Sequence, residues 1–487
     1  MRTLYLYGPP ASGKSWWANK IAVETGLAAV DLDAEIVRRA GRSIPDIFAT
    51  DGEKAFRDME SAALMSVDAP IVALGGGTLL RDGNREFAEE NGFVAVIDAD
   101  EEEIARRIEA AKGTRPLGNR LAERRPHYAS FRHHVAQGDE ILMPGLLRGR
   151  VTPPVSKSHL HRLLIAWFLS GKRVEDFDVP ENPGADIEAT LRCLEALESA
   201  NRGGEATLDC GESGSTLRFL APVAASLGVK ADFVRRGRLA DRPMIEYDGL
   251  KSGVHELRGD VSSQFVTGLL FALPTLDGDS MIRFTTPLQS RGYVDMTLDV
   301  VRGFGIVVYE TETGFAIPGG QRFTASGSLS PERDWSGAAF WYAANALGSH
   351  VEIEGLSEKS SQPDRVVAEL IGQIKSGGTI DVSGCPDNYP ALAVVAHSLG
   401  TGAKFTGTER LRLKESDRLA AMEDVFASPN DVDARNDHRI AMAAAILATA
   451  ADAPTIIHSP GCVRKSYPSF WSDFHRLQGN NKCMKNA

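Results

Sequence analysis

The stretch Gly8–Ser15 has the pattern G-x-x-x-x-G-K-S and restricts the fold of this chain more than any other feature. It lies between an apolar run that predicts a buried strand, residues 3–7, and a helical run, residues 16–25. In that setting the loop surrounds phosphates with backbone N–H groups, its lysine reaches the β- and γ-phosphates, and its last serine supplies a ligand to Mg²⁺. The expected nucleotide-binding residues of the loop are Gly8, Ser12, Gly13, Lys14 and Ser15.

A second predicted strand ends in Val30–Asp33. If the strand continues to Asp33, alternation puts Asp31 and Asp33 on one face, where one can hold hydrated Mg²⁺ and the other can accept a proton from a hydroxyl. A strand end whose acid caps the following helix explains the same residues equally well. Both interpretations stay open at this point.

Further elements of the same region carry basic residues and glycines. Residues 53–66 predict a helix with Arg57 and Glu60 one turn apart, which is also the spacing of a simple ion pair. Residues 71–77 predict a buried strand that runs into three glycines, as a close backbone approach to a small ligand or a tight turn requires. The remaining basic elements are a helix at 101–111, a loop at 113–117 and a segment at 124–128.

Together these motifs resemble shikimate kinase over residues 1–136, because the P-loop, D-x-D, F-R-x-x-E (Phe56–Glu60), G-G-G, R-P-L and R-x-P-x-Y occur in order. The resemblance implies an α/β P-loop kinase, a parallel sheet with helices on both faces, that uses ATP and Mg²⁺. It implies that shikimate is held by Asp33, Arg57, Gly76, Gly77 and Arg124, with Asp33 as the candidate base. It also implies that Lys14, Ser15, Arg107 (beside adenine) and Arg115 bind ATP, and that Ser15 and Asp31 lie at the Mg²⁺.

The composition limits the class of protein. With 487 residues, 43% hydrophobic and 24% charged, the chain is long enough for more than one globular domain. A net charge of -11 argues against a nucleic-acid or anionic-membrane binder. The five cysteines are scattered and form no CxxC, as expected for reduced thiols, a cytoplasmic location and no structural zinc. The N-terminus shows no signal peptide, and the most apolar run, residues 440–451, is too short to span a bilayer.

A polar, His-rich stretch, residues 131–139, marks the boundary between the kinase-like region and the rest of the chain. No long linker follows it, so these two parts of the chain are expected to sit close together. After it, short β runs alternate with amphipathic Ala- and Leu-rich helices, which suggests an internally repeated α+β unit. The predicted helices cover residues 163–169, 187–197, 216–225, 264–273, 337–346, 366–376, 391–399, 419–426 and 440–450.

The polar N-terminal ends of these helices are candidate binding sites. Residues 153–162 place Lys157, Ser158 and Arg162 at a helix start that a serine can cap, and such a start favours an anion. Any one of these ends is an ordinary capped helix start. A mostly cationic series in an acidic chain instead fits a cleft for two polyanions. The other members lie at 211–218, 241–244, 261–264, 289–293, 386–388, 414–418, 436–439 and 465–468.

This series resembles 5-enolpyruvylshikimate-3-phosphate synthase over about residues 140–477, with S-K-S-x-x-x-R, G-E-S-G-S-T-x-R, R-P-M, S-S-Q-F, K-E-S-D-R, N-D-H-R-x-A-M and K-S-Y-P in order. The resemblance implies an α+β transferase of two similar domains, built of repeated βαβαββ units that close on the substrates, with no metal or organic cofactor. By the resemblance, shikimate 3-phosphate is held by Lys157, Ser158, Arg162, Ser262, Ser263, Gln264, Ser290, Tyr293, Asp387 and Lys414. Phosphoenolpyruvate is held by Lys157, Gly214, Arg242, Gln264, Arg418, Arg439 and Lys465.

The implied reaction constrains the charges of the cleft. Both substrates carry a phosphate and a carboxylate, so arginines and lysines must neutralise them before they meet. The 5-hydroxyl then loses a proton while the enol carbon gains one, and phosphate leaves from a tetrahedral adduct, which requires an acid and a base. Asp387 and Glu415 are the candidate carboxylates, and Lys157 is the candidate for moving a proton or stabilising charge.

The chain is short for such a transferase. Between Arg418 and Asn436 there is room for a helix and a turn but not for a further hairpin, and the stretches 242–262 and after 376 also look short. The loss is expected to remove peripheral strands and not ligands, and an Asn expected before K-E-S-D-R is not recognisable. The expected domains are a kinase at 1–136, a linker at 137–143, a transferase at 144–477 (subdomains 157–330 and 144–156 plus 331–477) and a polar tail at 478–487.

The sequence therefore favours a bifunctional enzyme with shikimate, ATP and phosphoenolpyruvate as its small-molecule partners; it makes no prediction of oligomeric state. One alternative is another P-loop small-molecule kinase fused to a UDP-N-acetylglucosamine enolpyruvyl transferase. That relative is expected to carry a reactive cysteine in a Gly-rich loop, whereas the only thiol near residues 211–218 is Cys210, which precedes the turn. A second alternative is a regulatory binding protein with one inactive half, although every expected catalytic position is filled in both halves.

Overall fold

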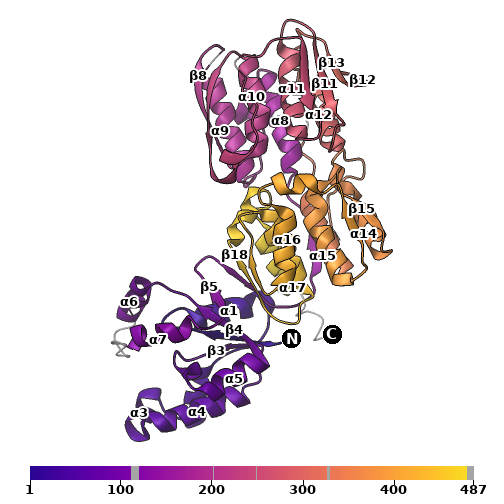
Figure 1. Cartoon of the computed structure of the whole chain (residues 1–487). Coiled ribbons are helices and arrows are strands. Elements are labelled where there is room, and N and C mark those ends of the chain that lie inside the picture. Colours follow the sequence, from indigo (N-terminus) through magenta and orange to yellow (C-terminus); the bar gives the residue numbers. More distant parts are fainter. Residues whose placement is uncertain (111–119, 201, 248, 326–329, 480–487) are drawn as a thin grey trace.

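The computed structural model describes residues 1–110, 120–200, 202–247, 249–325 and 330–479. The chain forms three bodies in a row (Figure 1). We call them the N-terminal body (1–139), the middle body (140–156 and 330–479) and the distal body (157–325). Within the described ranges no helix is long and apolar enough to cross a membrane.

The N-terminal body contains a five-stranded sheet in the order β2-β3-β1-β4-β5, and every pairing in it is parallel. The phosphate-binding loop follows β1, the central strand, and leads into α1 (Lys14–Thr25). The strands are β1 Thr3–Tyr7, β2 Ala29–Asp31, β3 Ile71–Ala73, β4 Gly92–Ile97 and β5 His133–Val135. The parallel α/β fold predicted for this region is confirmed.

Helices cover both faces of this sheet because its strands are apolar on both sides. In β1, Tyr5 and Tyr7 join one core and Leu4 and Leu6 join the other. The tyrosine side packs against most of the helices, and α1 packs on the leucine side through Trp17. The other helices are α2 Leu32–Ala40, α3 Ile44–Thr50, α4 Gly52–Ser66, α5 Asp82–Asn91, the peripheral α6 Glu101–Ala110 and α7 Arg120–Tyr128.

The second strand of the N-terminal body ends before it reaches Asp33. β2 stops at Asp31, whose carboxylate accepts a hydrogen bond from the backbone N–H of Ala34 at 3.2 Å. Asp33 lies in the first turn of α2. The prediction that Asp31 and Asp33 share one face of a strand is therefore wrong, and the helix-cap interpretation is correct.

The distal body carries one complete βαβαββ unit. Its strands and helices follow as β10 Val254–Arg258, α11 Ser263–Ala272, β11 Ser280–Thr286, α12 Arg291–Gly303, β12 Tyr309–Thr311 and β13 Gly314–Ile317, and its sheet has the order β10-β11-β13-β12. The rest of this body consists of α8 Lys157–Leu169, α9 Ala185–Ala200, β8 Glu205–Gly211, α10 Gly214–Ser226 and β9 Lys230–Arg235. A single apolar core joins both parts.

The middle body contains shorter sheets around a second core. Its parallel pairs β15–β16 and β17–β18 each enclose one helix, as in the β8–α10–β9 unit. The reduced strand number agrees with the predicted loss of peripheral strands. Its elements are β6 Glu140–Leu142, β7 Arg148–Val151, α13 Trp335–Ala346, β14 His350–Ile353, α14 Val367–Lys375, β15 Thr379–Asp381, α15 Tyr389–Leu399, β16 Lys404–Thr406, α16 Arg418–Ala427, β17 Asp431–Asp433, α17 His438–Thr449, β18 Thr455–His458 and α18 Phe470–Gly479.

Two chain segments connect the middle and distal bodies. The chain passes upward after β7 and returns before α13, and the two segments are joined at a β-bridge between Val155 and Arg333. The backbone N–H of Ser156 also donates to the Glu332 carbonyl at 2.7 Å. Because each repeated unit directs its helix N-termini to the same end of its strands, the polar helix starts of both bodies meet at this junction.

The junction between the N-terminal and middle bodies is a packed core and not a free linker. Ile141 of β6 and Ile456 of β18 are fully buried against Phe93 of β4 and Trp17 of α1. β6 pairs with β18 in antiparallel fashion, so Glu140–Leu142 belong to a strand and their assignment to a linker is wrong.

Polar contacts extend this junction. Lys20 of α1 donates to Glu140 at 2.8 Å. His458 of β18 lies 2.8 Å from both Asp139 and Asp431, and His133 of β5 also contacts Asp431 at 2.8 Å. We call Ile141, Ile456 and these polar groups the joint. The predicted close approach of the two halves is confirmed.

Candidate functional site

The phosphate-binding loop has the geometry that its glycines predict. Gly8 has a φ of 130°, and a Cβ atom there would lie 2.8 Å from the carbonyl oxygen of Ile97. Lys14 is 8% exposed, and its ammonium donates to the carbonyl oxygens of Pro9 at 2.6 Å and Gly8 at 3.1 Å. The loop is thus folded around its own lysine at the N-terminus of α1, where the helix dipole favours a phosphate.

Ser15 and Asp31 lie together beside this loop. The Ser15 hydroxyl donates to a carboxylate oxygen of Asp31 at 2.6 Å. Both residues line a cavity of about 1440 Å³ whose walls also include Asp33, Gly76 and Arg107. Serine and aspartate oxygens are the donors that Mg²⁺ prefers, so this pair can hold the predicted metal.

A second group of predicted residues lies behind the glycine turn that follows β3. Arg57 pairs with Glu60 at 2.7 Å, which confirms the ion pair, and a Cβ on Gly77 would lie 2.8 Å from the Arg57 guanidinium. Arg124 reaches the Gly76 carbonyl at 3.5 Å. The predicted shikimate residues are therefore grouped around Gly76, although Arg57, Gly77 and Arg124 do not line the large cavity.

Two arginines are predicted to bind ATP, and the structure describes only one of them. Arg107 of α6 donates to the Ala11 carbonyl at 3.1 Å and to Glu103 at 2.8 Å, so it lies against the phosphate-binding loop. Arg115 lies outside the described residues.

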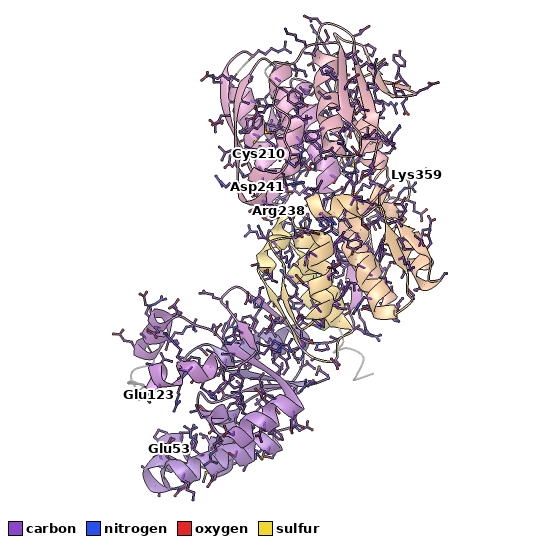
Figure 2. All side chains as sticks on the ribbon, viewed as in Figure 1. Glu53, Glu123, Cys210, Arg238, Asp241 and Lys359 are labelled. Atoms are coloured by element: carbon purple, nitrogen blue, oxygen red, sulfur yellow. The ribbon has the colours of Figure 1, made fainter. Side chains whose placement is uncertain are left out.

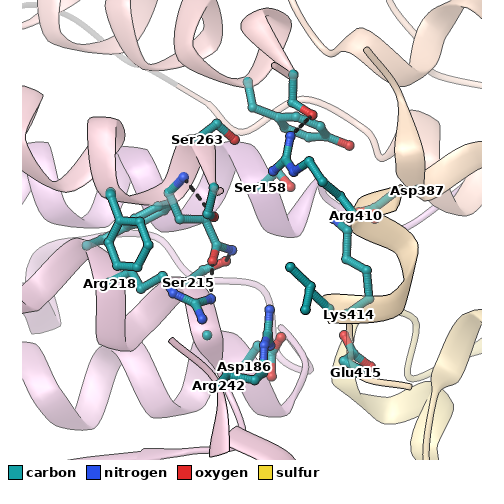
Figure 3. Close-up of a pocket in the computed structure, with 18 of the residues that line it drawn as sticks. Ser158, Asp186, Ser215, Arg218, Arg242, Ser263, Asp387, Arg410, Lys414 and Glu415 are labelled. Atoms are coloured by element: carbon teal, nitrogen blue, oxygen red, sulfur yellow. Dashed lines mark hydrogen bonds and ion pairs between the residues drawn. The ribbon is translucent and has the colours of Figure 1, made fainter. Parts of the chain in front are cut away.

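The second site lies in the cleft between the middle and distal bodies, in a cavity of about 110 Å³ (Figure 3). Every residue predicted for shikimate 3-phosphate lines it: Lys157, Ser158, Arg162, Ser262, Ser263, Gln264, Ser290, Tyr293, Asp387 and Lys414. Of the phosphoenolpyruvate set, Lys157, Gly214, Arg242, Gln264 and Arg418 line it too. Arg439 and Lys465 do not line it and contact acids at its edge.

Helix starts place these side chains, as the sequence predicts. Ser156 caps α8 and Ser262 caps α11 by accepting backbone N–H groups. At α17 the cap is Asp437, while Asn436 donates to Glu212 across the cleft at 2.9 Å. Gly214 opens α10 beneath two arginines, because a Cβ there would lie 2.8 Å from Arg242 and 2.9 Å from Arg218.

Asp387 is surrounded by cations. Its carboxylate receives hydrogen bonds from Lys414 at 3.2 Å, Arg418 at 2.9 Å and Arg439 at 3.0 Å. Burial opposes its ionisation, but the neighbouring charges of Arg439, Lys414 and Arg418 outweigh that effect and hold the pKa of Asp387 well below its usual range. Burial lowers the pKa of Lys414 to about 8 despite this partner.

Glu415 and Lys157 form two further ion pairs. Glu415 contacts the imidazole of His438 at 2.8 Å, and although burial raises its pKa, the charges around it, His438 first, hold the pKa well below the usual range. Lys157 pairs with Asp186 at 2.8 Å. Lys465 pairs with Glu212 of the distal body at 2.6 Å, so an ion pair crosses the cleft.

Several residues of this site were not assigned to a ligand from the sequence. Asp186, Arg218, Arg410 and His438 line the cavity, and Glu212 holds Lys465. Arg218 and Glu212 lie within a recognised motif, but nothing in the pattern distinguishes them from structural residues. Arg410 stands four residues before the lysine of K-E-S-D-R and lies outside that motif.

Cys210 does not take part in the site. It lies in β8 inside the distal body (Figure 2), is fully buried, and does not line the cleft. A hydrogen bond with Cys193 and burial both raise the pKa of its thiol. A buried, protonated thiol is unreactive, so this residue gives no support to the alternative transferase.

Comparison with known proteins identifies two families in this chain. The family model for shikimate kinase matches residues 10–140, and the model for EPSP synthase (3-phosphoshikimate 1-carboxyvinyltransferase) matches residues 242–428 and 423–474. The chain is 36% identical over 415 residues to the 3-phosphoshikimate 1-carboxyvinyltransferase of Clostridium kluyveri, covering 69% of this chain and 96% of that protein. It is 34% identical to that of Clostridioides difficile, covering 69% and 97%.

A solved EPSP synthase from Acinetobacter baumannii shares the fold of the C-terminal part, with a TM-score of 0.53, 19% identity, and coverage of 70% of this chain and 98% of that one. The alignment with the Clostridium kluyveri protein spans 415 positions but covers only 69% of the 487 residues of this chain, so the matched part of this chain is shorter than that relative. Both activities, shikimate kinase and 3-phosphoshikimate 1-carboxyvinyltransferase, follow from these matches, and the chain belongs to the 3-phosphoshikimate 1-carboxyvinyltransferase family with a shikimate kinase domain joined in front of it.

Proposed function

We propose that the two sites act in sequence on one molecule. The N-terminal body phosphorylates shikimate with ATP, and the cleft transfers the enolpyruvyl group of phosphoenolpyruvate to the 5-hydroxyl of the resulting shikimate 3-phosphate. The observation that carries the proposal is the cleft itself, because every residue assigned to shikimate 3-phosphate lines one cavity. We also propose the domain division into residues 1–139, 140–156 with 330–479, and 157–325, and a cytoplasmic location.

In the kinase site, Lys14 and the backbone N–H groups of Gly8, Ser12 and Gly13 hold the phosphates of ATP. Ser15 would hold Mg²⁺ with Asp31 behind it, since their oxygens are 2.6 Å apart. The metal would neutralise charge on the β- and γ-phosphates.

The shikimate carboxylate pairs with Arg57 and Arg124 near Gly76 and Gly77. Asp33, in the first turn of α2, faces the ring hydroxyls and accepts the proton of the attacking one. Arg107, which already lies on the phosphate-binding loop, reaches the nucleotide from α6. Arg115 is assigned to ATP binding on the basis of the family motif alone.

In the cleft, the positive charges come from both bodies and meet between them. Arg242 of the distal body and Arg439 and Lys465 of the middle body bind phosphoenolpyruvate. The ion pairs that these middle-body cations make with Asp387 and Glu212 hold them in place until a substrate anion replaces the carboxylate as partner.

The chemical step needs a base for the 5-hydroxyl and a proton donor for the enol carbon. The 5-oxygen forms a bond to C2 of phosphoenolpyruvate as C3 takes up a proton. The tetrahedral adduct then expels phosphate and returns a proton from C3. Asp387 takes the hydroxyl proton once the substrate anions draw Lys414 and Arg439 away, because losing those charges raises its pKa. Glu415 and Lys157 supply and remove the proton at C3.

A pair of matched variants tests this assignment. Lys14→Ala removes the phosphate ligand of the kinase, and Lys157→Ala removes a cation from the cleft, so each should abolish one activity and leave the other within about twofold. The two reactions are assayed separately, one with shikimate and ATP, the other with supplied shikimate 3-phosphate and phosphoenolpyruvate. Loss of both activities in a still-folded variant would contradict independent sites.

A further inference from the structure

The cavity around the phosphate-binding loop has one wall at the boundary between two bodies. Residues 136–140, which follow β5, line it together with the loop after β1 and residues 98–100 after β4. These three segments lie at the carboxyl ends of parallel strands, the edge of such a sheet where ligands bind. With the phosphates of ATP held by the loop after β1, the rest of the nucleotide extends into this cavity, where the turn at 136–139 forms a wall.

Asp139 holds the shape of this turn. The backbone N–H of Asp139 donates to the Ala136 carbonyl at 3.2 Å, and the Asp139 carboxylate accepts the Ala136 N–H at 2.8 Å. Gly138 between them has a φ of 95°, a conformation that favours glycine. The side chain of Asp139 is only 8% exposed, so its charge needs partners other than water.

The other partner of Asp139 comes from the middle body. Nδ1 of His458, in β18, lies 2.8 Å from the same carboxylate oxygen that accepts the Ala136 N–H. Its Nε2 lies 2.8 Å from Asp431. Carboxylates only accept hydrogen bonds, so both ring nitrogens carry a proton and the imidazole is positively charged; these two contacts raise the pKa of His458. Such charge-assisted hydrogen bonds are about twice as strong as neutral ones.

The backbone on the two sides of the turn is attached to different bodies. β5, which ends before the turn, pairs with β4 in the kinase sheet. β6, which begins directly after it, pairs with β18 of the middle body, and β18 lies beside β5 (Figure 1). His458 is the last residue of β18, so the strand that pairs with β6 also carries the side chain that holds the turn. A shift of β18 against the kinase sheet therefore displaces this wall of the cavity.

We propose that His458 is a positioning residue of the kinase: through Asp139, the transferase part of the chain fixes the turn at 136–139 against ATP, and the affinity of the kinase for ATP depends on this contact. The inference rests on the proposed function and adds a connection between the two parts of the chain. His458 does not line the cavity, so it acts through Asp139 and not on ATP itself. The turn is separate from the loop that holds the phosphates, so the contact affects the binding of ATP and not the chemical step.

Two substitutions of His458 separate its two contacts. The amide nitrogen of Asn lies as many bonds from Cβ as Nδ1 and can donate to Asp139, whereas that of Gln matches Nε2 and can donate to Asp431. The kinase is assayed in the full-length chain with shikimate, ATP and Mg²⁺. His458→Gln should raise the KM for ATP about three- to tenfold and leave kcat and the KM for shikimate within about twofold. His458→Asn should leave the KM for ATP within about twofold of the wild-type value.

Each variant is the matched control of the other, since both lose the positive charge and one hydrogen bond of the joint. Calorimetric titration with ADP, without shikimate, measures the same contact directly, and the dissociation constant should rise by a similar factor in His458→Gln alone. Transferase activity with supplied shikimate 3-phosphate and phosphoenolpyruvate reports that each variant is folded.

An unchanged KM for ATP in His458→Gln overturns the proposal. An equal rise in both variants also overturns it, because the lost charge or a general loosening of the joint would then be the cause. A KM for shikimate that rises as much as the KM for ATP overturns it as well, since the wall would not act on the nucleotide specifically. Wild-type chain that does not phosphorylate shikimate with ATP would instead contradict the proposed function.

Discussion

Arg439 donates a hydrogen bond from Nη2 to Oδ2 of Asp387 at 3.0 Å. The proposed base of the transferase is thus bound to a cation that we assign to phosphoenolpyruvate. Lys414 and Arg418 share the same carboxylate, so Asp387 offsets part of the positive charge of the cleft. This arrangement keeps buried cations paired and ties the activation of Asp387 to the arrival of the substrate anions.

Replacement of Asp387 tests its role as base. Asp387→Asn should lower the kcat of the transferase about 10²- to 10⁴-fold, because a general base is lost. Asp387→Glu keeps the charge near the three cations and should recover part of the activity. Steady-state kinetics with supplied shikimate 3-phosphate measures both. A kcat within about threefold of wild type in Asp387→Asn would assign the proton transfer to another group.

The depressed pKa of Lys414 predicts a pH limit for the transferase. Burial lowers this pKa to about 8, so the ammonium loses its proton, and its attraction for phosphate, as the pH rises through 8. The kcat/KM for shikimate 3-phosphate should therefore fall above pH 8. Lys414→Arg stays protonated in this range and should move the fall to higher pH. The same fall in both proteins would assign it to a different group.

The shared core predicts that the kinase and the middle body lose their structure together. Ile456 is fully buried in the joint, and Ile456→Ala should cost about 2–5 kcal/mol through lost burial and the remaining cavity. Heating followed by assays of the two residual activities should show that both inactivation temperatures fall.

The matched control is Leu270→Ala in the core of the distal body, where Leu270 is equally buried. This change should lower the inactivation temperature of the transferase and leave that of the kinase near the wild-type value. A kinase inactivation temperature that Ile456→Ala does not change would show that the N-terminal body is stable without the joint.

The joint also predicts a pH-dependent stability. Hydrogen bonds to Asp139 and Asp431 raise the pKa of His458 from 6.5 to about 10. Because the folded pKa lies above the unfolded one, this stabilisation is fully present below about pH 6.5 and is lost as the pH rises to about 10. His133, which also contacts Asp431, and both carboxylates are the titratable groups that lie around this imidazole.

Thermal unfolding between pH 6.5 and 10 should therefore show a falling Tm that is flatter in His458→Gln. His134→Gln serves as a matched control, because His134 pairs with Asp98 inside the N-terminal body. Equal slopes in wild type and His458→Gln would place the pH dependence elsewhere.

Local signals explain what the sequence could predict. The phosphate-binding loop, the caps at Ser156 and Ser262, and the helices with a clear apolar face depend on neighbours in the chain, and they are found where expected. The helix α12 was missed because it follows a left-handed Ser290 and has Gly292 in its first turn, an unfavourable beginning for a helix. The C-terminal helix α18 was missed as well.

Features that depend on docking could not be read from the sequence. Ile141 and Ile456 are ordinary apolar strand residues until β6 and β18 pair and their side chains pack into the core beside the sheet of the N-terminal body. Arg410 stands in an exposed-looking basic stretch, and only the approach of Ser290 from the distal body places it at the cleft. Most cleft residues within a motif were predicted, with Arg218, Glu212 and His438 as exceptions, whereas Asp186 and Arg410 lie outside the motifs and were missed.

The central claim is that one chain phosphorylates shikimate and then consumes the product. The most direct measurement supplies the full chain with shikimate, ATP and Mg²⁺, follows the reaction by phosphorus NMR, and then adds phosphoenolpyruvate. The account predicts shikimate 3-phosphate in the first stage, and in the second stage 5-enolpyruvylshikimate 3-phosphate with one equivalent of free phosphate. It is contradicted if shikimate is not converted in the presence of ATP, or if phosphoenolpyruvate releases phosphate at the same rate when shikimate 3-phosphate is absent.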